Sequence, residues 1–475
     1  MAGTSALANG ARVLGPVALA GATALVVVAA QYRMPGLVVP LTAALLGIVL
    51  AWVARRHVVA ATCTGVAVIG ALPVYAGRSL GGTHLGITPA LVVAVLLAPC
   101  ALEQLPRFRV VPMDLAVGAF WLLRLLSTLL NFSNKLGSSA GPALYLASTY
   151  VVFRLLMLRP GVLPAVTRTV IGLGAAEAVF AVLEHGGLAN VFFRLPSSGY
   201  EYSDFAKEQL RFGEPRAEAS FGHSIALGMF LALAMVLVVA VALETRNVIA
   251  RAALLGASGL VVLGTLDTLS RGALVALALG LVLWFAREAG RLRPATLAGV
   301  AAVGAAVVLL TPIRSTVSEL VASTQSTDTQ EAASSQHRFL ILELARDPSE
   351  FSVLGHKTTV SGTGGVNDQL EQRTGLGSFD NAYALVYLAN GLLTVLAFLA
   401  VAVLAFVSLG SVGLSGIERA WVAGLCAAAV NLFTVNLLTQ FQDFYWMAAA
   451  VAATSWQRVR TRRSARKAEL ARSTA

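Results

Sequence analysis

Residues 229–243, MFLALAMVLVVAVAL, decide the class of this protein, because a helix with this sequence has no polar face. A helix that is apolar all round is either buried in a large protein or spans a membrane. The whole chain of 475 residues shares this character, since 57% of its residues are apolar and only 12% are charged. Soluble domains have about a quarter of their residues charged. The composition therefore excludes an ordinary soluble protein and predicts a membrane protein.

The apolar runs predict helices and argue against a β-barrel. Outer-membrane barrels alternate apolar and polar residues over short segments, whereas the apolar runs of this chain are continuous. Backbone groups inside lipid must be bonded internally, and a helical span needs about 20 apolar residues. We therefore predict an all-α, polytopic transmembrane helical bundle of about 12–14 spans. The windows assigned to spans are residues 13–30, 36–54, 58–75, 87–102, 112–132, 142–158, 162–183, 223–243, 251–269, 272–286, 295–313, 381–408, 419–439 and 444–456.

The basic residues are distributed unequally across these spans. With the N-terminus inside, 21 of the 35 Lys and Arg residues fall on one side of the membrane, and seven of them lie between Arg458 and Arg472. An excess of Lys and Arg marks the cytoplasmic side. We therefore expect a multi-pass protein of the cytoplasmic (inner) membrane with both termini in the cytoplasm and no cleaved signal peptide. The excess of Lys and Arg on the cytoplasmic side then explains the net charge of +11, and we expect no nucleic-acid partner.

Two long segments, residues 184–222 and 314–380, interrupt the pattern of short turns and are expected on the extracytoplasmic side. Long connections of this kind are usually functional or disordered. Within the second, residues 334–351 carry an apolar stripe between helix start and stop signals, which predicts a short amphipathic helix on the membrane surface or a lid without chemistry. The expected division is N-terminal spans 1–183, loop 184–222, central spans 223–313, loop 314–380, C-terminal spans 381–456 and a basic tail 457–475.

Ionisable residues inside spans or at their ends are costly and often functional. Asp267 and Arg271 share a face if their helix continues through Ser270, and they then either form an ion pair that locks two helices or leave Arg271 to face a phosphate. Arg124 and Glu177 fall within two other spans, where mutual pairing is one interpretation. Arg124 is expected to be structural.

The outer loop ends in LRFGEPRAEASFGHSIALG, residues 210–228, in which Arg211 and Arg216 approach the membrane and His223 opens a helix. A helix N-terminus offers free N–H groups and partial positive charge, so this corner favours an anion. The alternative is a solvated loop with ion pairs to Glu214 or Glu218.

At a second outer corner, Asp380 and Asn381 begin a span, where Asp380 could also be a simple helix cap. His356 lies in the loop before them, and a lone loop histidine often has no special role.

Four of these stretches, in this order, resemble the O-antigen ligase and O-antigen polymerase (Wzy-like) superfamily of membrane glycan transferases over roughly residues 160–410. They are RAEASFGHSIALG (216–228), SRGALVALALG (270–280), HRFLILELARDPSEFSVLG (337–355) and FDNAYALVYLANGLL (379–393). The resemblance implies a GT-C-like fold and an inverting, metal-independent transfer of a glycan from a polyprenyl diphosphate, such as undecaprenyl diphosphate, to an acceptor hydroxyl at the outer membrane face. It implies a lipid-linked glycan donor, a glycan or lipid-glycan acceptor, the bilayer, and polysaccharide-export or chain-length proteins as candidate partners.

The resemblance also implies roles for individual residues. Arg216 and Arg271 match the arginines thought to hold the donor diphosphate, and we add the neighbouring Arg211. Ligases of the family have a histidine proposed as the base directly before the asparagine that Asn381 matches, and this chain has Asp380 there. Because of this difference, the sequence does not decide whether the protein is a polymerase or a ligase. Asn381 is therefore expected in a supporting role, together with Asp267 and Arg338.

The chemistry of the residues is consistent with such an enzyme. Cleavage of the bond between an anomeric carbon and a diphosphate builds negative charge, which fixed cations stabilise. The attacking hydroxyl needs a proton acceptor, for which Asp380, His223 and His356 are the candidates. We expect no metal and no cofactor, because no carboxylate cluster suited to magnesium is evident. The alternatives are a flippase of lipid-linked glycans, a small-anion carrier or a structural scaffold for envelope assembly.

Overall fold

The computed structural model describes residues 50–51, 53–73, 78–79, 86–131, 136–194, 209–211, 214–288, 345–346, 351–355 and 381–473. Its long elements are all helices, which confirms the all-α class. They are α3 (Val58–Ala71), α4 (Pro89–Leu102), α5 (Pro112–Asn131), α6 (Leu136–Leu156), α7 (Val162–His185), α9 (Ser224–Glu244), α10 (Val248–Asp267), α11 (Arg271–Glu288), α16 (Ala382–Asn390), α17 (Leu392–Leu409), α18 (Gly416–Asn431) and α19 (Phe441–Ser473).

The described strands are short and form two antiparallel pairs. Strand β1 (Arg78–Ser79) pairs with β2 (Gly86–Ile87), and β3 (Leu210–Arg211) pairs with β4 (Glu214–Pro215). Three single turns of 3₁₀ helix are η2 (Leu105–Arg107), η4 (Val191–Arg194) and η5 (Ala219–Phe221).

Five of the described helices, α5, α7, α9, α10 and α17, are long and apolar enough to cross a membrane, and α3 and α4 are shorter apolar helices. The protein therefore has the helices of a multi-pass membrane protein. The predicted windows 13–30 and 295–313, and most of 36–54, lie outside the described residues.

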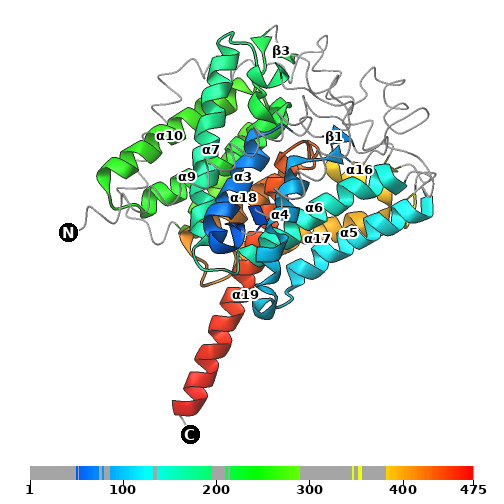
Figure 1. The fold of residues 1–475 in the computed structure, drawn as a ribbon, viewed down its shortest axis with the longest axis vertical. Coiled ribbons are helices and arrows are strands. Elements are labelled where there is room, and N and C mark those ends of the chain that lie inside the picture. Colours follow the sequence, from blue (N-terminus) through cyan, green and yellow to red (C-terminus); the bar gives the residue numbers. More distant parts are fainter. Residues whose placement is uncertain are drawn as a thin grey trace.

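Helix α9 is the centre of the bundle, with 89% of its apolar window buried. It packs against α7, α10, α11 and α18 (Figure 1). Small residues bring these helices close together: a Cβ atom on Gly174 of α7 would lie 2.6 Å from the Ala234 Cβ of α9. Such close approach is how helices pack in lipid, where no hydrophobic force drives them together.

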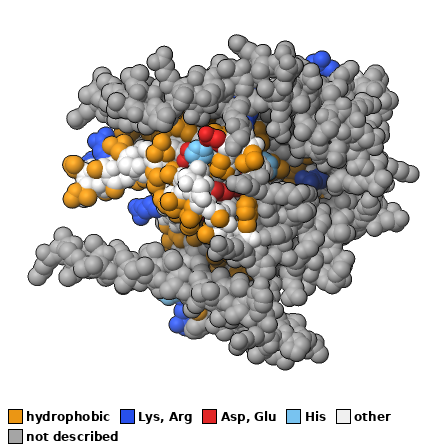
Figure 2. Space-filling model, turned by 90° about the horizontal axis from the view of Figure 1, so that it is seen from above, with side chains coloured by type: hydrophobic (Ala, Val, Ile, Leu, Met, Phe, Trp, Pro, Cys, Tyr) orange, Lys and Arg blue, Asp and Glu red, His pale blue; other side chains and the backbone are white. Residues whose placement is uncertain are grey.

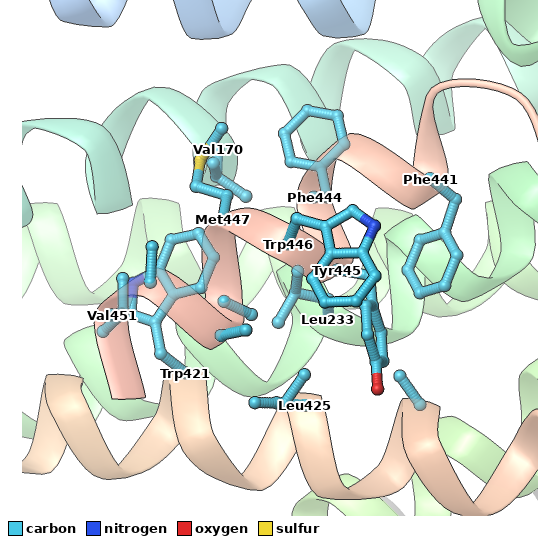
Figure 3. Packing of buried hydrophobic residues seen from close by; sticks show 14 of the residues in the cluster. Val170, Leu233, Trp421, Leu425, Phe441, Phe444, Tyr445, Trp446, Met447 and Val451 are labelled. Carbon is cyan, nitrogen blue, oxygen red and sulfur yellow. The ribbon is translucent and has the colours of Figure 1, made fainter. Parts of the chain in front are cut away.

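The core beside α9 is built from the first turns of α19. Figure 3 shows Phe444, Tyr445 and Met447 of α19 in one buried cluster with Leu233 of α9 and Trp421 of α18. The Trp421 indole N–H donates to Thr167 Oγ1 of α7 at 2.9 Å, so this buried ring also has its polar atom satisfied.

The predicted continuous span 381–408 is wrong, because Gly391 divides it into α16 and α17. Gly391 has φ +86° and ψ 175°, a conformation open essentially to glycine alone. Its backbone also packs against residues 353–355, where a Cβ would lie 2.3 Å from Gly355 N and 2.6 Å from Val353 O. The apolar sequence around Gly391 carries no sign of this contact.

Replacing Gly391 by alanine should therefore lower the free energy of unfolding by about 1–3 kcal/mol, the cost of a residue forced into such a conformation. Thermal unfolding of the purified protein in nanodiscs measures this loss. Gly256 serves as a control, because a Cβ there meets nothing within 4 Å, and Gly256→Ala should leave the thermal midpoint Tm unchanged or raise it. Equal Tm values for the two variants would contradict the division at Gly391.

The predicted span 444–456 and basic tail 457–475 form one helix, α19, because the tail is rich in the good helix formers Arg, Ala and Glu. Figure 1 shows the C-terminal half of α19 projecting from the bottom of the bundle, whereas β3 lies at the top. The basic tail and the β3 loop are thus at opposite ends of the molecule.

Candidate functional site

The loop before α9 is fixed by a small hairpin. Arg216 N–H donates to Gln209 O at 2.8 Å, which extends the pairing of β3 with β4. Ala217 N–H donates to the carbonyl of Asp267 at 3.0 Å, which fastens the loop to the end of α10. The side chain of Gln209 then joins the loop to α9, because its Oε1 accepts from Ser224 Oγ at 3.2 Å.

Two of the predicted arginines meet at the turn between α10 and α11. Arg216 Nε donates to Thr268 O at 3.1 Å, and Arg211 Nη1 donates to Leu269 O at 2.7 Å. The last carbonyls of a helix have no partner within it and attract cations. The turn therefore holds both guanidinium groups, each half-buried, directly before Arg271, the first residue of α11.

The condition under which Asp267 and Arg271 would share a helix face, a helix that continues through Ser270, is not met. Helix α10 ends at Asp267, and Leu269 has φ +49° in the turn that follows. Asp267 and Arg271 therefore do not share a face of one helix, and the ion pair that depended on this geometry loses its basis. Asp267 is half-buried and instead interacts electrostatically with His185 of α7.

Two carboxylates of α7 hold the rest of the loop. Glu184 Oε2 accepts the backbone N–H groups of Glu218 and Ala219 at 3.0 and 2.8 Å, and Glu177 Oε2 accepts that of Ser220 at 3.2 Å. Glu177 is thus engaged with the loop. Sequence reasoning missed Glu184, whose only signal was its position seven residues after Glu177 on the same helix face.

Strained backbone conformations lie in this loop and in the segments that contact it. Three non-glycine residues in the described part of the chain have positive φ: Ala219 in η5, Leu269 in the α10–α11 turn and Thr439 before α19. Thr439 precedes Gln440, whose Nε2 donates to Ser220 O at 2.7 Å. Such conformations cost about 1–3 kcal/mol each and cluster at functional sites.

His223 precedes the membrane-spanning part of α9 as its N-cap. The ring Nδ1 accepts the N–H of Ile225 at 3.2 Å. Burial and the neighbouring Arg216 lower the pKa of His223 from 6.5 to about 3. The ring is then neutral at pH 7 with its proton on Nε2, so it is better suited to donate a hydrogen bond to an anion than to accept a proton.

The lowered pKa of His223 predicts a pH-dependent stability. Between pH 6.5 and about 3 the unfolded ring binds a proton that the folded ring does not. The free energy of unfolding should therefore fall as the pH drops through this window. In His223→Asn, which can still cap α9, this contribution is absent, and the Tm of the variant should fall less than that of the wild type between pH 7 and pH 4. Parallel pH profiles of Tm would contradict the buried neutral ring.

The second corner, around Asn381, is built on α16. Asn381 is its N-cap, with Oδ1 accepting the Ala384 N–H at 2.9 Å, and the side chain is buried. The Ala382 N–H donates to the carbonyls of Leu432 and Val435 at 2.9 and 3.1 Å, in the segment that follows α18. The predicted site residues Asp380, His356 and Arg338 lie outside the described residues, as does most of the predicted amphipathic helix 334–351.

The segment after α18 brings the two corners together. Asn431, the last residue of α18, donates from Nδ2 to Gly272 O of α11 at 2.9 Å and to the Met229 sulfur of α9 at 2.7 Å. The first turns of α9, α11 and α16 therefore meet around residues 431–435. Sequence reasoning did not single out Asn431, because its partners are distant in the chain.

Figure 2 looks onto this end of the molecule. Acidic and histidine side chains gather in the middle of the described surface, among hydrophobic ones. His185 Nε2 lies 3.6 Å from Glu214 Oε2 of the loop.

The described contacts of Arg124 and Glu177 do not include the predicted pairing between them. Glu177 binds the loop, and the Arg124 guanidinium lies 5.6 Å from the Trp121 ring centroid on α5.

Among the described residues, no group of three or more His, Cys, Asp or Glu is arranged to hold a metal ion. No protein-family model matches this chain, and no curated protein sequence matches it either.

Proposed function

We propose that the protein transfers a glycan from a polyprenyl-diphosphate carrier to an acceptor hydroxyl at the outer face of the cytoplasmic membrane, as a polymerase or a ligase. The observation that supports this most is the meeting of Arg211, Arg216 and Arg271 at the α10–α11 turn, beside the first turns of α9 and α16. By the positive-inside rule the basic tail is cytoplasmic, and the arginines at the opposite end then face outward.

The proposed role of the arginines follows from the charge that develops in the reaction. As the bond from the anomeric carbon to the diphosphate breaks, the electron pair of that bond moves to the departing oxygen. Guanidinium groups fit the oxygens of a phosphate with paired N–H donors and stay charged at any physiological pH. Because Arg211 and Arg216 are held by backbone carbonyls, they need little rearrangement to stabilise this charge.

The acceptor hydroxyl loses its proton to a group at the same end of the molecule. The neutral ring of His223, with Nδ1 accepting a backbone N–H, suits hydrogen-bond donation to the diphosphate. We therefore assign proton removal to Asp380 first, since it stands directly before the Asn381 cap that joins this corner, and to His356 second.

A transporter is the competing function. Carriers place polar groups near the membrane midplane, in broken helices of corresponding halves. In this chain Glu177 has a local role, because it holds the loop that carries Arg216. This favours the enzyme over the carrier.

An assay in proteoliposomes separates the two functions. Protein supplied with a polyprenyl-diphosphate-linked repeat unit should release free polyprenyl diphosphate and lengthen the glycan, as measured by chromatography of both products. Passage of the intact donor across a sealed bilayer, without covalent change, would contradict the enzyme and support the flippase.

A further inference from the structure

A cavity of about 230 Å³ lies beside the start of α16, between α5, α17 and α19. Ala382, the first residue of α16, lines it, whereas Arg211, Arg216 and Arg271 do not. At about 30 Å³ for each water molecule, it has room for about eight waters, a volume suited to one sugar ring rather than to a chain.

Arg124 supplies the positive charge of this cavity. It is the charged residue among those that line the space, and its guanidinium carbon lies 5.6 Å from the centroid of the Trp121 ring. A cation over an indole face is attracted by the negative face of the ring. Ionisable groups within spans such as α5 are retained where they serve a site.

Two tryptophans contribute to the wall of this cavity. Trp121 and Trp446 both line it and are 8% and 1% exposed. Their Nε1 atoms each expose less than 1 Å², so neither N–H group opens into the cavity. The two indole rings therefore contribute apolar wall.

The remaining lining combines flat aromatic walls with side-chain amides. Phe120 stacks on Phe398 and Trp446, with ring centroids 4.9 and 5.4 Å apart. Asn390, Asn436 and Gln442 place amides around the same space. Amides both donate and accept, as sugar hydroxyls do, and the C–H faces of a sugar ring pack on aromatic surfaces.

We propose that this cavity binds one acidic sugar unit, with its carboxylate toward Arg124 and its ring against the aromatic wall. This rests on the proposed function, since it names the acceptor as a glycan that carries a carboxylate. A phosphate group also pairs with arginine, but it has no ring for the wall and no neutral hydroxyls for the three amides. The amides and the wall therefore favour the sugar.

Binding can be measured on the full chain in nanodiscs of zwitterionic lipid, by titrating tryptophan fluorescence with sodium glucuronate, glucose or inorganic phosphate. Glucuronate should give saturable quenching with an affinity about tenfold or more above that of glucose, since a charge-assisted hydrogen bond is worth about 1.5–3 kcal/mol. Arg124→Met should remove this preference for glucuronate. Arg462→Met, which removes an exposed charge of α19, should change nothing.

Equal affinities for glucuronate and glucose, or unchanged glucuronate binding in Arg124→Met, would overturn the proposal. Phosphate binding as tight as that of glucuronate, or displacement of glucuronate by added phosphatidylglycerol, would overturn it in favour of a phosphate or lipid-headgroup site. Because the titration contains no lipid-linked donor, its result is independent of the transfer assay. Glucuronate binding without glycan transfer would count against the proposed function alone, and transfer without glucuronate preference would count against the sugar site alone.

Discussion

Replacing Arg216 by alanine should slow glycan transfer by about 10²–10³-fold, the usual effect of removing one fixed donor from a developing negative charge. The loss should appear mainly in kcat, because the charge on the departing oxygen exists only in the transition state. The measurement is the initial rate of polyprenyl diphosphate release by purified protein at saturating donor.

The fold should survive this change, since Arg216 is half-buried and its side chain makes hydrogen bonds rather than filling a core. Arg216→Lys keeps the charge but loses the paired N–H geometry, and it should recover only part of the rate. Arg462→Ala, at the far end of α19, is the matched control for removal of a positive charge. A rate within about twofold of wild type in Arg216→Ala would remove Arg216 from the proposed diphosphate clamp.

Replacing Arg154 by methionine should lower the free energy of unfolding by about 3–5 kcal/mol, the cost of breaking a buried ion pair from one side. Arg154 is 1% exposed, and its Nε lies 2.9 Å from Asp114 Oδ1. Its Nη2 also donates to Gln457 Oε1 at 2.8 Å, so one guanidinium joins α5, α6 and α19. Unfolding in nanodiscs, followed by circular dichroism, measures the loss.

The reason for this cost is the carboxylate left behind. In Arg154→Met, Asp114 stays buried beside Tyr150, whose hydroxyl donates to Asp114 Oδ1 at 2.7 Å, without the compensating charge. Adding Asp114→Asn removes the stranded charge and should restore part of the stability. A double variant less stable than Arg154→Met would show that the lost packing of Arg154, rather than the buried charge, sets the cost.

Much of the helical framework could be predicted from local sequence. The start of α9 at Ser224 and of α7 at Val162 agree with the predicted windows within one residue, because caps and long apolar runs are local signals. The resemblance also named Arg216 and Arg271, and the structure places both residues at the α10–α11 turn.

The contacts that hold the site could not be predicted, because they join residues far apart in the chain. Arg216 and its acceptor Thr268 are 52 residues apart, and Arg211 and Leu269 are 58. The position of Glu184 seven residues after Glu177 does not indicate that its carboxylate binds the loop backbone. The division at Gly391 was missed for the same reason, since a glycine in an apolar run is tolerated in helices and its contact with residues 353–355 is tertiary.

A structure of the protein with its lipid-linked donor bound would test the proposed clamp most directly. We expect diphosphate oxygens within about 3 Å of the guanidinium nitrogens of Arg216 and Arg271, at the end of the bundle opposite the α19 tail. A diphosphate bound elsewhere, with both guanidinium groups turned away from it, would contradict it.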